Sequence, residues 1–212
     1  MDDPLLQYAE ANSTPENAVL KSLRIKTWQT VLSPQMLSDS VQGSFLANIS
    51  RMIRPRHILE LGTYSGYSTI CLSAGLQSEG TIDTIEPNDE LHAIQEEHWK
   101  KAGIFDQVRR HTCEALTALP NLNGPYDLVW IDADKLRTPA YVQLCLNRTR
   151  IGGWILVDNV LWWGKVLPDH PAPDETALAL RKMTEDLASR KSIRTTLMPM
   201  RDGLLMIEKL SD

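Results

Sequence analysis

Short apolar runs alternate with longer helical stretches from residue 57 onward. Each run is of strand length and is bounded by polar or turn-forming residues; the runs lie at 57–61, 81–86, 108–113, 127–132 and 154–158. Strands that alternate with helices in this way are typical of a doubly wound α/β fold with a parallel sheet. The pattern therefore predicts an α/β core over residues 57–209.

The last two apolar runs lie too close together for a parallel connection. They cover 193–199 and 203–209, so only residues 200–202 separate them. A parallel crossover needs a dozen or more residues, whereas a hairpin needs only a few. We therefore expect a Rossmann-like doubly wound sheet of about seven strands whose last strand is antiparallel.

Two helices are predicted ahead of the sheet, at 14–32 and 33–53. Each begins with a hydroxyl residue and a proline, the types favoured at the N-cap and first helical position; these pairs are Thr14-Pro15 and Ser33-Pro34. The sequence shows no repeat, low-complexity tract or internal linker. Residues 1–212 are thus predicted to form one domain, in which 1–53 supplies N-terminal helices and 57–209 the α/β core.

Acidic side chains end two of the predicted strands. Asp132 ends one run, and Asp158 ends another with Asn159 directly after it. If these strands are neighbours, their carboxyl ends meet at the edge where parallel sheets bind ligands. Two carboxylates and an amide oxygen suit a hard cation, which predicts a site for Mg²⁺, or for Ca²⁺ or another divalent cation. Lys135 follows Asp132 closely enough to reach whatever that cation binds.

Ordinary structural roles are the alternative for these charged residues. An Asp after a strand often caps a helix or stabilises a turn. For Asp132 the next helix start is already supplied by Thr138 and Pro139, which are predicted to be its N-cap and first residue. For Lys135 the alternative is a surface salt bridge to Asp134. Both interpretations stay open on these residues alone.

A glycine-containing turn follows the first strand. A dinucleotide-binding turn needs a second glycine two positions after the first, so that the backbone can touch a pyrophosphate. Here Gly62 is followed at that position by Tyr64, although Gly66 comes later. Glu86, at the end of the second strand, is placed to accept hydrogen bonds from both ribose hydroxyls. The turn therefore favours a nucleoside ligand without phosphates over NAD.

Charge and cysteine content narrow the expected partners. Lys plus Arg number 22 and Asp plus Glu 27, giving a net charge of −5. An acidic chain has no general attraction for nucleic acid. No stretch approaches the ~20 apolar residues of a membrane span, and the acidic start is unlike a signal peptide. The three widely spaced cysteines suggest reduced thiols that fill the core, so a cytoplasmic protein without membrane contact is predicted.

Five segments resemble one enzyme family, the cation-dependent class I S-adenosylmethionine O-methyltransferases of the catechol and caffeoyl-CoA group. These segments are ELGTYSGYS at 60–68, IEPNDE at 85–90, DLVWIDADK at 127–135, DNVLWWGKV at 158–166 and RDGLL at 201–205. The resemblance extends over residues 33–209. It implies a class I methyltransferase domain, S-adenosylmethionine and Mg²⁺ as cofactors, and a homodimer.

The resemblance also implies roles for single positions. Lys135 matches the catalytic lysine and a substrate contact, and the metal ligands match Asp132, Asp158 and Asn159. The positions that match cofactor contacts are Glu60, Gly62, Tyr64, Gly66, Ser68, Glu86, Ala115 and Asp132. Trp162 and Trp163, directly after the metal positions, are expected either to wall an aromatic substrate slot or to pack in the core or against a second subunit.

Three places depart from the family pattern. Ser-Asp at 38–39 replaces a usual Val-Gly near the methionine end of the cofactor, and Cys-Glu at 113–114 replaces a common Gly-Asp near the adenine. Leu-Leu at 204–205 follows Gly203, where animal catechol methyltransferases carry an acid that orients the second substrate hydroxyl. That contact is predicted to be missing here.

Together these features predict a methyl transfer to one hydroxyl of a catechol-type small molecule. Two adjacent hydroxyls can chelate a cation, which stabilises the phenolate, and Lys135 in its neutral form can accept the proton. A caffeoyl-CoA-type substrate is an alternative supported only by Lys165 near the slot. A tRNA hydroxyuridine methyltransferase is disfavoured by the net charge of −5. A catalytically silent cofactor-binding protein is disfavoured by the intact metal and lysine positions.

Overall fold

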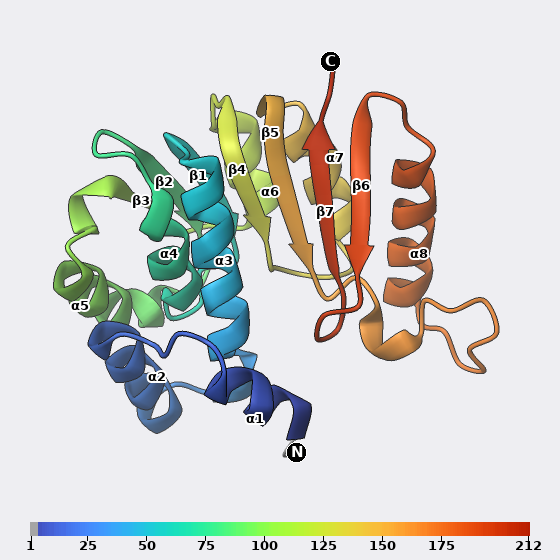
Figure 1. Ribbon diagram of the computed structural model, residues 1–212. Coiled ribbons are helices and arrows are strands. Elements are labelled where there is room, and N and C mark those ends of the chain that lie inside the picture. Colours follow the sequence, from blue (N-terminus) through green and yellow to red (C-terminus); the bar gives the residue numbers. More distant parts are fainter. Residues whose placement is uncertain (1–3) are drawn as a thin grey trace.

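A seven-stranded sheet forms the centre of the computed structural model, which describes residues 4–212 (Figure 1). The strand order is β3-β2-β1-β4-β5-β7-β6. Strands β1 to β5 pair in parallel, and β7 runs antiparallel to both of its neighbours. The strands are β1 (His57–Leu61), β2 (Thr81–Ile85), β3 (Val108–His111), β4 (Tyr126–Ile131), β5 (Thr149–Asp158), β6 (Ile193–Met198) and β7 (Leu204–Lys209). The predicted doubly wound sheet with an antiparallel last strand is confirmed.

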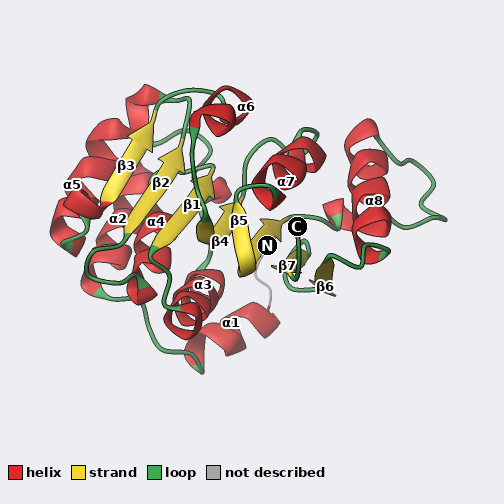
Figure 2. Ribbon diagram, turned by 90° about the horizontal axis from the view of Figure 1, so that it is seen from above, coloured by secondary structure: helices red, strands yellow, loops and turns green. Residues whose placement is uncertain are grey.

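Helices cover both faces of this sheet (Figure 2). One face is covered by α6 (Ala115–Ala118), α7 (Thr138–Leu146) and α8 (Glu175–Ala188). The other face is covered by α2 (Ala18–Thr30), α3 (Ser40–Ile53), α4 (Tyr67–Leu72) and α5 (His92–Ala102), and α1 (Pro4–Ala11) packs against α3. Short 3-10 turns connect several elements, at Pro34–Met36, Ser73–Gly75, Asp89–Leu91, Phe105–Gln107, Leu119–Asn121 and Trp162–Gly164.

Alternate residues along the strands pack into two separate cores. In β4, Val129 and Ile131 face α6, α7 and α8, whereas Leu128 and Trp130 face the other helical layer. All four side chains are buried. Burial on both faces explains why the parallel strands are continuous apolar runs in the sequence. No helix within residues 4–212 is long and apolar enough to cross a membrane.

The first predicted helix begins later than its sequence signal indicated. Helix α2 begins at Ala18, and the N-cap is Asn17, whose side chain accepts a hydrogen bond from the Leu20 amide at 2.9 Å. The predicted start at 14–15 is therefore wrong, because the asparagine carbonyl supplies the cap three residues further on. Helix α1 was not predicted.

The second N-terminal helix also begins later. Ser33 has a left-handed backbone (φ 58°) and makes no cap, so the predicted Ser33-Pro34 start gives only one 3-10 turn. Helix α3 begins at Ser40, where Asp39 accepts a hydrogen bond from the Gln42 amide at 2.8 Å. An extended backbone with an acceptor side chain is what an N-cap requires, and Asp39 meets both conditions. Helix α7 differs by one residue, since Thr138 is its first residue and not its N-cap.

The ends of β1 and β4 meet where the strand order reverses. The Asp132 amide donates to the Leu61 carbonyl at 2.8 Å, which ties the two strand ends together. Gly62 follows with φ +90°, and a Cβ built there would lie 2.0 Å from the Asp132 carbonyl oxygen. Only glycine fits so close an approach. Such a reversal point is where open α/β sheets bind ligands.

Gly62→Ala should therefore destabilise the fold by more than about 3 kcal/mol, because it combines a left-handed backbone with a backbone overlap. The matched control is Gly103→Ala, where φ is +72° but no atom lies within 4 Å of the added Cβ. The control should lower the free energy of unfolding by only about 1 to 2 kcal/mol, which is the cost of placing alanine in a left-handed backbone. Urea unfolding of both variants measures the difference, and equal losses would show that the Gly62–Asp132 approach is unimportant.

Candidate active site

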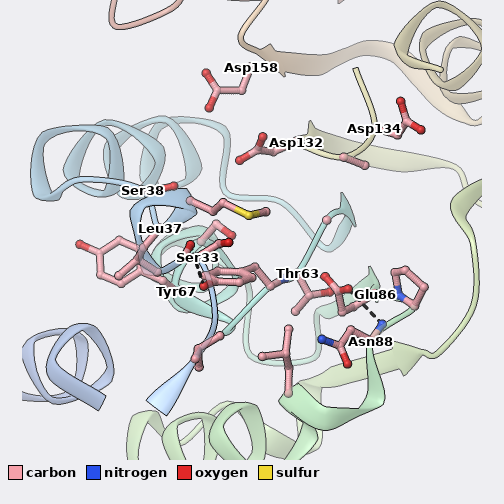
Figure 3. A pocket seen from close by; sticks show the side chains of 18 of the residues that line it. Ser33, Leu37, Ser38, Thr63, Tyr67, Glu86, Asn88, Asp132, Asp134 and Asp158 are labelled. Atoms are coloured by element: carbon pink, nitrogen blue, oxygen red, sulfur yellow. Dashed lines mark hydrogen bonds between the residues drawn. The ribbon is translucent and has the colours of Figure 1, made fainter. Parts of the chain in front are cut away.

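A cavity of about 1410 Å³ opens at the carboxyl edge of the parallel strands. Its walls come from the turns after β1, β2, β4 and β5, from the segment 31–38, and from the β6–β7 hairpin. Figure 3 shows Asp132 and Asp158 together at one end of this cavity and Glu86 with Asn88 towards the other. The cavity is thus acidic at both ends.

Most of the predicted site residues line this cavity. They are Gly62, Tyr64, Ser68, Glu86, Ala115, Asp132, Lys135, Asp158, Asn159, Trp162 and Trp163. Two predicted cofactor contacts, Glu60 and Gly66, are not in the cavity lining and lie beneath residues that are. Gly66 is packed against Trp99, since a Cβ there would lie 2.7 Å from the indole nitrogen.

At the end of the cavity that holds Asp132 and Asp158, a lysine pairs with Asp132, the residue directly after β4. Lys135 Nζ lies 2.5 Å from Asp132 Oδ1 and 3.5 Å from the Asp158 carbonyl oxygen. The alternative salt bridge from Lys135 to Asp134 is not formed. Asp134 instead accepts from the Leu136 amide at 2.9 Å and points away from the acid pair (Figure 3). Lys135 therefore points into the site.

Asp158 is the more deeply buried acid of the pair, with only 3% of its surface exposed. Its Oδ2 accepts a hydrogen bond from Gln42 Nε2 at 2.7 Å, and its Oδ1 accepts from the Asn159 amide at 2.9 Å. Burial raises the pKa of the Asp158 carboxyl, and the nearby charge of Asp132 raises it further. The two carboxylates therefore repel one another unless positive charge lies beside them.

The donor chemistry of this end fits a hard divalent cation. Within residues 4–212 no cluster of three His, Cys, Asp or Glu side chains is suited to a metal. Asp132 and Asp158 would contribute carboxylates, and Asn159, the predicted third donor, would contribute an amide oxygen. Asn159 has a left-handed backbone (φ 60°), a conformation that asparagine tolerates and that is common at functional sites. Asp132, Asp158 and Asn159 are therefore the residues that would hold such a cation.

At the second end, Glu86 is fixed by backbone amides. Its Oε2 accepts from the Tyr64 amide at 2.8 Å and its Oε1 from the Asn88 amide at 3.1 Å. Tyr64 lies in the left-handed region (φ 47°), and its hydroxyl donates to the Leu32 carbonyl at 3.0 Å. The turn after β1 is thereby tied to the segment that covers the cavity. One lone pair on each Glu86 oxygen remains for a ligand hydroxyl.

Glu60, in β1, anchors the glycine-containing turn through buried hydrogen bonds. It is completely buried, and burial raises the pKa of its carboxyl to about 7. Three hydroxyls donate to it at 2.6 Å each, from Ser68, Thr69 and Thr84. Glu60 thus joins α4 to β1 and β2, and it positions Ser68 in the cavity wall without reaching the cavity itself.

Both tryptophans line the cavity, and Trp162 also packs against the core on the α6–α8 side of the sheet. The two rings lie 4.5 Å apart at an angle of 49°. The Trp162 indole donates to both oxygens of Asp174 at 3.0 Å, while the Trp163 amide donates to Asp202 Oδ1 at 2.6 Å. Trp163 is 71% exposed, so the core-packing alternative is wrong for this residue. Both backbones are left-handed, with φ values of 49° and 52°.

Three of the residues that depart from the family pattern have polar partners here. Ser38 is buried in the cavity wall, and its carbonyl accepts from Arg24 at 3.1 Å. Asp39, besides capping α3, pairs with Arg201 at 3.0 Å. Glu114 pairs with Arg137 at 3.1 Å at the rim.

Four residues at or near the cavity were not found by sequence reasoning. They are Glu16, Arg24, Gln42 and Asp202. The Arg24 guanidinium donates to Glu16, which in turn accepts from the Tyr67 hydroxyl. Only Asp202 carried a sequence signal, as part of the RDGLL segment. Gln42 and Glu16 have partners 116 and 51 residues away, and no motif linked Glu16 to Arg24, eight residues further on.

The sequence is similar to O-methyltransferases along most of its length. The sequence model of the O-methyltransferase family matches residues 10–210. The chain is 32% identical over 214 residues to catechol O-methyltransferase domain-containing protein 1 of Mus musculus, covering 99% of this chain and 81% of that protein. It is 34% identical over 164 residues to the catechol O-methyltransferase of Mycobacterium tuberculosis, covering 77% and 74% respectively.

The fold is similar to a solved O-methyltransferase as well. TomG from Streptomyces achromogenes, which is involved in tomaymycin synthesis and was solved with S-adenosylmethionine, superimposes with a TM-score of 0.90. The two chains are 29% identical, and the match covers 99% of this chain and 97% of TomG.

The buried Glu60 predicts a specific dependence of stability on pH. Its pKa is about 7 in the fold, above the ordinary glutamate value of 4.5, so the folded protein keeps a proton that the unfolded chain loses. The stabilisation is complete below pH 4.5 and is lost as pH rises through 7, by about 1.4 kcal/mol per pH unit at most and on the order of 3 kcal/mol in total.

Glu60→Gln cannot ionise and should lack this loss. Urea unfolding at pH 5 and pH 8 should therefore show a smaller decrease for Glu60→Gln than for the wild type. The exposed Glu185→Gln on α8 is the control and should behave like the wild type. The same decrease in all three proteins would show that Glu60 does not carry the effect.

Proposed function

Because the chain belongs to the O-methyltransferase family, whose sequence model it matches over residues 10–210, we propose that it methylates one hydroxyl of a catechol-type small molecule held by a divalent cation. The methyl donor is S-adenosylmethionine, as in the similar structure of TomG. The methyl group passes from the sulfonium to the hydroxyl oxygen, the sulfonium becomes a thioether, and the hydroxyl proton is lost.

One observation carries this proposal. A single cavity holds Asp132, Asp158 and Lys135 at one end and Glu86 at the other, with the tryptophan pair in its lining. A nucleoside bound at Glu86 and an aromatic diol bound at the acid pair would share that cavity. Holding two reactants in one cavity removes much of the entropic cost of their reaction.

We assign the cofactor end to the turns after β1 and β2. Glu86 accepts the ribose hydroxyls with its remaining lone pairs, and Ala115 lines the same cavity. Gly62 lets the cofactor approach the backbone, and Ser68 lines the same wall. Glu60 and Gly66 support the cofactor end without lining the cavity. Glu60 does so by binding α4, and Gly66 by packing against Trp99.

We assign the other end to cation and substrate. Asp132, Asp158 and Asn159 would hold the cation, preferably Mg²⁺, because Mg²⁺ is usually bound by one or two carboxylates and keeps several waters, whereas Ca²⁺ takes about six to eight oxygens. When bound, a divalent cation supplies positive charge that favours the ionised form of a phenolic hydroxyl. Lys135, whose Nζ lies 2.5 Å from Asp132 Oδ1 and 3.5 Å from the Asp158 carbonyl oxygen, is placed to accept the phenolic proton in its neutral form, which a cation bound at the acid pair would favour.

A small aromatic diol suits the mouth of this cavity better than a CoA thioester. The phosphates of CoA need free cations, but the basic side chains of the cavity lining other than Lys135, and Lys165 beside the tryptophan pair, are already paired. These ion pairs are Lys26–Glu97, Arg137–Glu114, Lys165–Asp174 and Arg201–Asp39. The acidic net charge of −5 likewise disfavours tRNA. The homodimer and the cytoplasmic location stay predictions.

The proposal predicts that the substrate needs two adjacent hydroxyls, because one oxygen cannot chelate the cation. With S-adenosylmethionine and Mg²⁺, guaiacol should be methylated on the order of 10²-fold more slowly than catechol, which corresponds to a few kcal/mol of lost charge stabilisation. Chelation with EDTA should abolish catechol methylation, and added Mg²⁺ should restore it.

Binding of S-adenosylhomocysteine is the control for this experiment and should be the same with and without EDTA. Full activity after exhaustive chelation would contradict the cation, and equal rates for guaiacol and catechol would contradict the diol.

A further inference from the structure

Asp158 is held by a side chain from a distant helix. Gln42, in the first turn of α3, donates from Nε2 to Asp158 Oδ2 at 2.7 Å. Both residues are almost completely buried, at 1% and 3% exposure. Each Asp158 oxygen thus has one protein donor, which leaves lone pairs free on both oxygens. The contact constrains the carboxylate without saturating it.

A second contact fixes the orientation of the side-chain amide of Gln42. Arg201, in the β6–β7 hairpin, donates from Nη1 to Gln42 Oε1. Because a guanidinium can only donate, it selects the amide oxygen and leaves the amide nitrogen to face Asp158. The ionised Asp158 carboxylate can only accept and favours the same orientation, so the two contacts reinforce one another.

Arg201 is held in turn by the start of the same helix. Its Nε lies 3.0 Å from Asp39 Oδ2. Asp39, the N-cap of α3, also accepts a hydrogen bond through Oδ1 from the backbone amide of Gln42. Asp39, Arg201 and Gln42 therefore form a closed set of contacts that ends on Asp158. The departure from the family pattern at Asp39 thereby acquires a role at the site.

From this geometry we infer that Gln42 is a positioning residue for the cation site, with Arg201 fixing its amide. This inference rests on the proposed function, in which Asp158 is a ligand. A buried carboxylate that loses one hydrogen-bond donor is free to turn. Loss of a hydrogen-bond partner of a metal ligand typically lowers metal affinity by about 10- to 100-fold. Gln42 touches neither substrate nor cofactor in this account and acts through Asp158.

Direct binding of Mn²⁺, followed by electron paramagnetic resonance, tests this inference without any turnover. Gln42→Leu should raise the Kd for Mn²⁺ by about 10- to 100-fold, while the Kd for S-adenosylhomocysteine stays at its wild-type value. Arg201→Met should raise the Mn²⁺ Kd less, because the side-chain amide of Gln42 remains but loses one of the two contacts that orient it. The double variant should bind Mn²⁺ no more weakly than Gln42→Leu alone, because both changes act through one contact.

Gln95→Leu is the matched control. Gln95 is also a fully buried glutamine that accepts from an arginine, Arg110, but its amide nitrogen donates to Tyr64 at the cofactor end. The same substitution there should leave the Mn²⁺ Kd at its wild-type value. A general loosening of the cavity would instead change Mn²⁺ binding in both glutamine variants and would contradict a specific role for Gln42.

The outcomes separate this inference from the proposed function. Wild-type Mn²⁺ affinity in folded Gln42→Leu overturns the inference and leaves the cation site standing. Absence of Mn²⁺ binding in the wild type overturns both. If Gln42→Leu does not fold, Arg201→Met decides the question, and an unchanged Mn²⁺ Kd in that variant overturns the inference.

Discussion

The repulsion between Asp132 and Asp158 is the constraint on which the rest of the site depends. Strands β4 and β5 pair in parallel with Ile131 opposite Val157, so the residues that follow are brought side by side at the sheet edge. Burial of Asp158 makes this arrangement costly unless positive charge or donors lie nearby. The surrounding contacts supply them: Lys135 pairs with one acid, and Gln42 donates to the other. In the proposed function a divalent cation completes this compensation.

The opposite end of the cavity is built from backbone rather than from charge pairs. Glu86 is fixed by two amides, one of them from Tyr64, whose left-handed backbone follows from the tight turn after β1. That turn is anchored at Gly62 against the carbonyl of Asp132 and at Glu60 through three hydroxyls. Because Asp132 belongs to the acid pair, the two ends of the cavity share one strand junction. A shift of that junction would move both reactants.

Sequence reasoning found the parts of the site that follow from strand periodicity. Asp132 and Asp158 end apolar runs, and parallel strands bring such ends together, so their proximity was predictable. Gln42 was not, because its partner Asp158 lies 116 residues away and Arg201 lies 159 residues away, with no local pattern to link them. The start of α3 was misplaced because a Ser-Pro pair resembles a helix start, while Asp39 provides the backbone geometry that a cap needs. Glu60 matched a cofactor position, but burial removes it from the cavity.

Ionisation of a bound catechol is the central chemical claim, and ultraviolet difference spectroscopy measures it directly. A free phenol with a pKa near ~10 is neutral at pH 7, and its phenolate absorbs at longer wavelength. With S-adenosylhomocysteine in place of the methyl donor, catechol bound to the wild-type protein should show the phenolate band when Mg²⁺ is present and lose it when EDTA is added. A neutral catechol spectrum for the bound diol, identical with and without Mg²⁺, would contradict the account.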